Sequence, residues 1–298
     1  MREWLRPDLS PDTDWLTFPT NLVFDEETGH LFIQDRDSRA ILEVDESGEL
    51  VRVYGRAGEG PGEIGHASAI AVRGDRVVAV DNGNLKILVF RRDGTVETEF
   101  RIPRFYRDLE ILEDGSLVVV PGNEHAVEII DLEGRVIDGF GERELLGAAG
   151  YSADLALARF DDERVVALRG HRPELYVFDP ADGSARLVDL YEMPLMRGWR
   201  DEVAAQLRRV QRAGGGRSWM SAEVHVRDGS TVMISPAPPD LMTNGREVWL
   251  LDVDTGSVER FSYGEPLIGY STWLAYPRLF TTHVRDGTIL EYRFPEQR

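Results

Sequence analysis

The chain of 298 residues contains no cysteine. This absence excludes a disulfide framework, thiolate-bound zinc or iron–sulfur clusters, and a cysteine nucleophile. Lysine is almost absent as well, because Lys86 is the only one and 33 of the 34 basic residues are arginine. The arginine bias has two interpretations that the sequence leaves open: the base composition of the genome, or a use of guanidinium groups for bidentate contacts with anions.

Basic residues are too few to balance the 53 acidic ones, and the formal net charge is −19 at pH 7. A charge of this sign and size repels nucleic acids and anionic membrane surfaces at long range. We therefore expect neither nucleic acid nor membrane as a partner.

Long apolar runs are also missing. No stretch of about 18 apolar residues occurs, which is what a membrane-spanning helix requires, and residues 1–14 lack the basic and apolar regions of a secretory signal. As the chain stands, it predicts a cytoplasmic protein; a periplasmic or extracellular location would follow if a signal peptide had been removed.

What the sequence does contain is a repeat of short apolar runs, rich in Val, Ile, Leu and Phe, separated by Gly and Asp turns. This pattern is typical of many short antiparallel strands. Within each unit the turn between the first two strands is expected at Gly29, Asp75, Gly115, Glu163, Gly229 and Pro277. Four of the five spacings match the roughly 40 to 50 residues of a four-stranded propeller blade.

A second marker keeps the same period. The turn after the third strand is expected at Gly48, Gly94, Gly134, Gly183 and Gly256. The two markers together predict an all-β fold, a six-bladed β-propeller that forms a single domain over residues 1–298; five blades remain the alternative, because the last unit is the least regular. We expect an N-terminal strand around Trp15–Phe18 to complete the last blade and close the ring, since an open edge there would promote aggregation.

The repeat is interrupted in two places. Residues 191–219 form an insertion between blades, in which residues 200–212 carry apolar residues at helical spacing and are followed by three glycines, so we expect one helix there. Ser235–Gly245 contains prolines that exclude a central strand and indicate a long loop.

One unit resembles a known family. The segment Gly55–Ile64 (GRAGEGPGEI) leads into Ile70–Gly94, which contains Val80, Asp81, Asn84 and the run Ile87, Val89, Phe90, Asp93 and Gly94. These residues resemble the Gly-rich linker, the "V-x-D-x-x-N" turn and the "I-x-V-F-x-x-D-G" strand of the NHL-type six-bladed propellers, although Val80 and Asp81 are adjacent here and Pro121 replaces the Asp in the next unit. The resemblance implies the fold and little about activity, because the superfamily includes binding scaffolds, calcium-dependent lactonases, lyases and sugar-acting enzymes.

Propeller geometry predicts where a site would lie. The loops that join successive blades, and those between second and third strands, share one face around the central funnel, and both interruptions of the repeat fall on that face. Residues at the starts of the inner strands would line the funnel, with ligand-binding candidates Arg107, Tyr151, Trp219, Tyr270 and Trp273 alongside Asn21. Aromatic platforms with a few polar groups are common in small-molecule sites; the alternative is that the aromatics pack between blades and the charges pair with each other.

Acid–base and metal chemistry would use side chains on the same face. The catalytic candidates are His66, His125, His171, Asp108, Asp154 and Glu223. The three histidines are also the candidate ligands of a divalent metal ion such as zinc, whereas calcium would use carboxylates, Glu124 among them. There is no H-x-H or H-E-x-x-H spacing, no G-x-S-x-G elbow, no phosphate-binding loop and no dinucleotide-binding motif.

Two functional hypotheses follow. In the first, the chain is a scaffold that binds a small molecule or a protein partner at the funnel face, with the helix over 200–212 and the Pro-rich loop at its rim. In the second, it is a hydrolase or lyase that acts on a small polar metabolite in the funnel, either with a metal ion or by His and carboxylate acid–base catalysis. The scaffold hypothesis requires no set of catalytic residues, and no such set can be recognised in the sequence.

Overall fold

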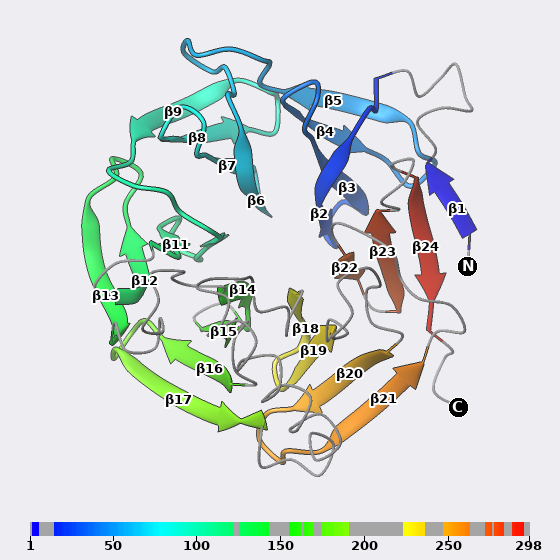
Figure 1. Cartoon of the computed structure of the whole chain (residues 1–298), viewed down its shortest axis with the longest axis vertical. Coiled ribbons are helices and arrows are strands. Elements are labelled where there is room, and N and C mark those ends of the chain that lie inside the picture. The colour runs from blue at the N-terminus through cyan, green and yellow to red at the C-terminus, as the bar shows by residue number, and fades with distance from the viewer. Residues whose placement is uncertain are drawn as a thin grey trace, which may run out of the picture.

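The structure is a computed structural model that describes residues 2–5, 15–121, 125–142, 155–161, 164–169, 174–190, 223–235, 247–262, 272–275, 277–282 and 288–294. Over these residues the chain is all-β, and its strands form six antiparallel sheets of four strands each (Figure 1).

Three sheets come from the N-terminal half of the chain, each with its strands in sequence order from the inside outward. The first contains β2 (Pro19–Asp25), β3 (His30–Asp35), β4 (Ala40–Val44) and β5 (Leu50–Tyr54). The second contains β6 (Ala67–Arg73), β7 (Arg76–Asp81), β8 (Lys86–Arg91) and β9 (Val96–Arg101). The third contains β10 (Leu109–Ile111), β11 (Leu117–Val119), β12 (His125–Ile130) and β13 (Val136–Glu142).

The C-terminal half supplies the others. The fourth sheet contains β14 (Leu155–Arg159), β15 (Val165–Arg169), β16 (Glu174–Asp179) and β17 (Ser184–Asp189). The fifth contains β18 (Glu223–Asp228), β19 (Thr231–Ser235), β20 (Glu247–Asp252) and β21 (Val258–Ser262). The last contains β22 (Thr272–Ala275), β23 (Arg278–Thr282), β24 (Ile289–Arg293) and, on its outer edge, β1 (Arg2–Leu5).

The sheets are arranged as a closed ring, which is the architecture of a β-propeller (Figure 1). Each innermost strand contacts the innermost strand of the next sheet, in the order β2, β6, β10, β14, β18 and β22, and β22 contacts β2 again. Every described hairpin turn between first and second strands, and between third and fourth strands, falls where the two Gly and Asp markers predict it. The periodic part of the sequence interpretation is therefore confirmed.

The strand that completes the last sheet is N-terminal, but it is not the one expected. β1 pairs with β24 through Arg2 opposite Glu291 and Leu5 opposite Ile289. The expected strand at Trp15–Phe18 is wrong: these residues form a turn and a bend that lead directly into β2. Leu16 is buried there in the core between the last and the first sheets, so its apolar side chain serves packing instead of strand pairing.

The turns after the third strands of the first five sheets each contain a glycine with positive φ, and the one at Asp93 shows why Asp and Gly recur there. Gly94 has φ = 89°, which L-residues with a side chain rarely adopt, and its N–H donates to Arg91 O (2.8 Å). Asp93 Oδ1 accepts from the N–H (2.9 Å) and the hydroxyl of Thr95. This local hydrogen bonding closes the hairpin without any tertiary contact.

The Asp of the "V-x-D" turn has a structural role in the second sheet. Asp81 is fully buried. Its carboxylate accepts from the N–H groups of Gly65 (2.8 Å) and His66 (2.7 Å), which enter β6, and from those of Gly83 (3.0 Å) and Asn84 (3.2 Å) in the turn after β7. One buried carboxylate thus holds together the two loops that face the funnel.

Asp35 does the same in the first sheet. It is fully buried and accepts from the N–H groups of Thr17 (3.1 Å), Phe18 and Ser38 (3.0 Å). In the third sheet Pro121 occupies this position, and the following residues, 122–124, lie outside the described ones.

Apolar side chains fill the spaces between neighbouring sheets. Phe32 and Ile41 of the first sheet pack with Val77, Ala79 and Leu88 of the second in one buried cluster. Similar clusters of buried residues lie between the second and third sheets and between the third and fourth. Each sheet therefore buries its faces only against its neighbours, as in other repeat architectures.

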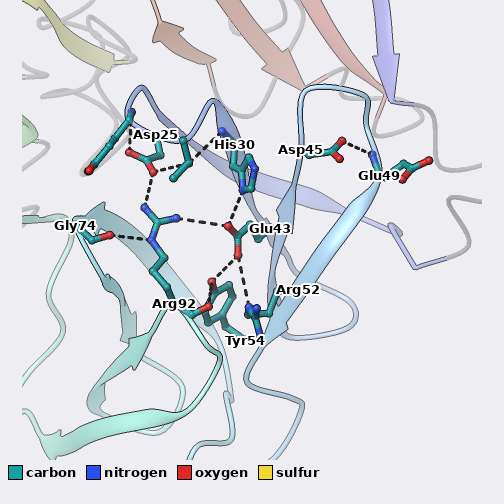
Figure 2. Close-up of polar contacts among 11 residues, drawn as sticks. Asp25, His30, Glu43, Asp45, Glu49, Arg52, Tyr54, Gly74 and Arg92 are labelled. Atoms are coloured by element: carbon teal, nitrogen blue, oxygen red, sulfur yellow. Dashed lines mark hydrogen bonds and ion pairs between the residues drawn. The ribbon is translucent and has the colours of Figure 1, made fainter.

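A polar network joins the first two sheets beside this core (Figure 2). Glu43 is buried and accepts from His30 Nδ1 (2.7 Å) and from the hydroxyl of Tyr54 (2.6 Å). Arg92 of the second sheet bonds to Asp25 Oδ2 and lies 3.6 Å from Glu43 Oε1. Burial and the adjacent Glu43 carboxylate raise the pKa of Tyr54 above its usual value, so this phenol stays protonated and donates.

Two sequence predictions lie outside the described residues: the helix over 200–212 within the insertion 191–219, and most of the loop Ser235–Gly245. No helix in the described part of the chain is long and apolar enough to cross a membrane.

Candidate functional site

A pocket of about 420 Å³ opens on the face that carries the loops between sheets. It lies where β2 and β6 begin, beside the segment that leads into β10. Its lining residues are Thr20, Asn21, Gln34, His66, Ala67, Ser68, Asn82, Phe105 and Arg107. Three successive sheets, or the loops that enter them, therefore contribute to one pocket.

Side-chain amides form the floor of the pocket between the first and second sheets. Asn21 Nδ2 donates to Gln34 Oε1 (2.7 Å) within the first sheet and to Ser68 O (3.0 Å) in β6. Gln34 is buried and donates from Nε2 to Ala67 O (2.5 Å). Amides that are paired in this way fix the position of the two inner strands.

Asn82 attaches the next segment, residues 102–108, to the same floor. Its Nδ2 donates to Ser68 Oγ (2.7 Å) and to Tyr106 O (2.7 Å), and its Oδ1 accepts from Tyr106 N–H (3.1 Å). The Tyr106 ring is buried in the core between the second and third sheets, and burial raises the pKa of its phenol. With Tyr106 anchored, the alternating neighbours Phe105 and Arg107 are directed to the surface.

The rim of the pocket consists of His66, Phe105 and Arg107, all exposed. The Phe105 side chain is 64% exposed, which is unusual for an aromatic residue. None of the described lining residues is a carboxylate, although the chain as a whole carries a charge of −19. A guanidinium, an imidazole and an aromatic ring on a rigid amide floor fit a ligand that has an anionic group and an apolar group.

Three of the predicted funnel residues, Asn21, His66 and Arg107, thus share this pocket. Asp108 lies next to Arg107 but has another role: its carboxylate accepts from Leu109 N–H (2.9 Å) and from Leu157 N–H (2.8 Å), and so ties β10 to β14.

Other predicted residues lie elsewhere. His125 begins β12, and its ring lies directly over Gly139 of β13. An added Cβ atom at Gly139 would come within 2.4 Å of that ring, so His125 lies on the outer strands. Trp273 lies edge-on to His225, with 4.7 Å between ring centroids, and lines a different cavity at the opposite end of the ring. Glu223 begins β18, and its backbone pairs with Ser235.

The remaining predicted site residues lie outside the described part of the chain: Glu124, Tyr151, Asp154, His171, Trp219 and Tyr270. Among the residues that are described, no group of three His, Cys, Asp or Glu side chains is placed to hold a metal ion.

The sequence interpretation missed Gln34, Ser68, Asn82 and Phe105. Asn82 lies in the loop between β7 and β8, the second and third strands of its sheet, and loops of this kind are predicted on the funnel face. An amide beside a buried Asp was the available signal. Phe105 had no signal, because only the burial of its neighbour Tyr106 directs its ring outward.

Comparisons with known proteins support the fold class. No family model matches the chain, and no curated protein matches it in sequence. Many solved structures do match the chain. The three described below share its overall architecture at low sequence identity.

A Bacteroides fragilis protein, provisionally described as exported, is 15% identical with a TM-score of 0.64 over 94% of this chain and 82% of its own. A catalytically inactive virginiamycin B lyase from Staphylococcus aureus with quinupristin is 12% identical, with a TM-score of 0.60 over 98% and 88% of the two chains. The WD40 domain of Neurospora crassa Pan2 is 12% identical, with a TM-score of 0.58 over 100% and 98%. At these identities the similarity shows the β-propeller fold alone.

Proposed function

We propose that this protein is a ligand-binding β-propeller scaffold, and that its binding site is the pocket rimmed by His66, Phe105 and Arg107. The observation that carries the proposal is the convergence of three exposed, chemically distinct side chains on a floor that hydrogen-bonded side-chain amides hold rigid. A surface that served only to cover the sheets would not need an exposed phenylalanine beside an arginine. We propose further that the six sheets are the blades of an NHL-type ring.

The chemistry of the rim defines the class of ligand. Arg107 offers a fork of N–H donors to a carboxylate or phosphate, and His66 adds a further donor beside it. Phe105 offers an apolar ring on which a planar or aliphatic group packs. The ligand class is therefore a small organic anion with an apolar group, free in solution or at the end of a partner.

Phenyl phosphate is a suitable probe, because it combines one anionic group with one aromatic ring. We expect isothermal titration calorimetry to detect binding that Arg107→Gln weakens about tenfold, as for loss of a charge-assisted hydrogen bond. Phe105→Ala should weaken it about fivefold through lost ring contact.

Arg101→Gln is the matched control, because Arg101 is also exposed but lies on the outer strand β9. Its affinity should equal that of the wild type. If the wild type does not bind phenyl phosphate at millimolar concentration, or if Arg101→Gln weakens binding as much as Arg107→Gln does, the proposed site is wrong.

A further inference from the structure

The floor of the proposed binding pocket consists of polar side chains whose hydrogen-bonding capacity can be counted atom by atom. Four of them are half-buried and line the pocket: Thr20, Asn21, Ser68 and Asn82. A side chain that already donates all of its hydrogens can only accept from a ligand, so this count identifies the groups that the floor can still bind.

The donors of Asn82 are all used within the protein. Its Nδ2 carries two hydrogens, and these go to Ser68 Oγ (2.7 Å) and to Tyr106 O (2.7 Å). Its Oδ1 accepts from Tyr106 N–H (3.1 Å). Asn82 therefore supports the floor but has no donor left for a ligand.

The two hydroxyl groups of the floor also have acceptors within the protein. Thr20 Oγ1 donates to Gln34 O (3.3 Å). Ser68 Oγ lies within hydrogen-bond distance of two backbone carbonyls, Val80 O (3.4 Å) and Tyr106 O (3.3 Å). Each hydroxyl hydrogen thus has a backbone carbonyl as its partner.

The orientation of the Asn21 amide is fixed by its partners. Its two Nδ2 hydrogens go to Gln34 Oε1 (2.7 Å) and to the backbone carbonyl of Ser68 (3.0 Å). A rotated amide would place Oδ1 against Ser68 O, and two acceptors would then face each other. Gln34 cannot rotate with it, because its own Nε2 donates to Ala67 O (2.5 Å).

Asn21 Oδ1 is therefore the end of this amide that remains for a ligand. Within the described part of the chain this oxygen has no hydrogen-bond partner, and it is not one of the fully buried atoms that lack one, so solvent reaches it. The pocket thus combines donors at its rim, from His66 and Arg107, with a free acceptor on its floor.

We propose that this pocket selects organic anions that carry a hydroxyl group at the end opposite to the anionic group, and that Asn21 recognises the hydroxyl. The anionic group binds at Arg107, the apolar body packs against Phe105, and the hydroxyl donates to Asn21 Oδ1. The inference rests on the proposed function, because it concerns the same pocket, and it adds the class of ligand and its orientation.

A hydroxyl fits the floor better than an ammonium group, which would also donate. An ammonium ion loses hydration when it enters a pocket, and it needs a carboxylate or several acceptors in return. No carboxylate belongs to the described lining of this pocket. One neutral carbonyl oxygen satisfies one hydroxyl donor, so the pocket favours the neutral group.

Isothermal titration calorimetry of the full chain with three matched ligands tests the inference: phenyl phosphate, 4-hydroxyphenyl phosphate and 4-methoxyphenyl phosphate. The hydroxyl compound adds one donor to phenyl phosphate, and the methoxy compound keeps the oxygen but lacks the hydrogen. We expect the wild type to bind the hydroxyl compound about fivefold more tightly than phenyl phosphate, as for one neutral hydrogen bond. The methoxy compound should show no such increase in affinity.

Asn21→Ala and Asn21→Leu should each remove the difference in affinity between the hydroxyl compound and phenyl phosphate. Circular dichroism shows which of the two variants folds, and the methoxy compound decides if neither does. The control is Thr28→Ala, which also loses a side-chain hydrogen bond, to Asp25, but lies in the turn at the far end of β2. It should keep the difference.

The inference is overturned if the wild type binds the hydroxyl compound and phenyl phosphate equally well, or if the methoxy compound binds as tightly as the hydroxyl compound. A difference that persists in a folded Asn21 variant would also overturn it. These results would leave the binding of phenyl phosphate, and with it the proposed function, intact. If none of the three ligands binds, both the inference and the proposed function are wrong.

Discussion

At the scale of single residues, buried side chains with a complete set of hydrogen bonds position the exposed ones. Asp81 is the strongest case, because one carboxylate accepts from four backbone N–H groups in two loops. The Asp81→Asn variant would turn an amide N–H₂ toward some of those donors. We expect it to lower the free energy of unfolding by about 2–4 kcal/mol, measured by urea denaturation.

The matched control for Asp81 is Asp93→Asn, in which the carboxylate closes an exposed hairpin turn and contacts Thr95. This change should lower the free energy of unfolding much less than Asp81→Asn does, because the Asp93 carboxylate is exposed to solvent. Equal effects of the two substitutions would mean that Asp81 is not the residue that holds the loops together.

The raised pKa of Glu110 makes the free energy of unfolding depend on pH, and the direction of the shift gives the sign of that dependence. Its pKa is raised from 4.5 in the unfolded chain to about 7 in the folded one, so the folded state binds this proton more tightly. The contribution of Glu110 is fully present below pH 4.5 and is lost as the pH rises to 7. Urea denaturation should show that the stability of the wild type relative to Glu110→Gln declines across this window and is constant above it; a constant difference throughout would contradict the raised pKa.

The residues of the pocket were only partly predictable. His66, Arg107 and Asn21 were found because the repeat identifies where inner strands begin. Gln34 was missed because an amide that pairs with the next sheet leaves no pattern within one repeat. Asn82 had a signal, its position beside the buried Asp81, that was not used. Phe105 was missed because its exposure depends on Tyr106, whose burial is a tertiary property.

At the scale of elements, the ring depends on the pairing of β1 with β24. Removal of residues 1–14 exposes the edge of β24, and exposed edges pair with other chains. We expect the truncated protein to have a melting temperature at least about 5 °C lower and to aggregate on size-exclusion chromatography. A synthetic peptide of residues 1–14 should restore both properties, whereas an unchanged melting temperature would show that β1 is dispensable.

The contact between the first two sheets offers a second test at this scale. Arg92 reaches from one sheet to Asp25 of the other, and its Nε also donates to Gly74 O (2.9 Å). A double-mutant cycle with Asp25→Asn and Arg92→Gln should give a coupling energy of about 1–3 kcal/mol in urea denaturation. A coupling below about 0.5 kcal/mol would show that the pair does not join the sheets.

The elements themselves were largely predictable. Asp and Gly at fixed positions reveal the hairpin turns, because the positive φ of Gly94 and its equivalents is required locally. The choice between two short N-terminal segments was not predictable in this way: residues 2–5 and 15–18 both combine tryptophan with leucine, and only packing of Leu16 against the neighbouring sheets decides between them.

At the scale of the whole molecule, charge is distributed unevenly. The chain carries a net charge of −19, whereas the pocket rimmed by His66, Phe105 and Arg107 has an arginine and no carboxylate among its described lining residues. A negative surface around a locally positive pocket disfavours non-specific binding of polyanions, while small anions can still reach the pocket. We therefore expect small anions to bind at this pocket.

The most direct test of the proposed binding site is hydrogen–deuterium exchange of the full chain with and without phenyl phosphate. Exchange should become slower in residues 65–68, 82–84 and 104–108, which form the floor and rim of the pocket that contains His66, Phe105 and Arg107. Slower exchange confined to the opposite end of the ring, at residues 158–161 and 226–230, would contradict the proposed site, as would no change in any of these segments.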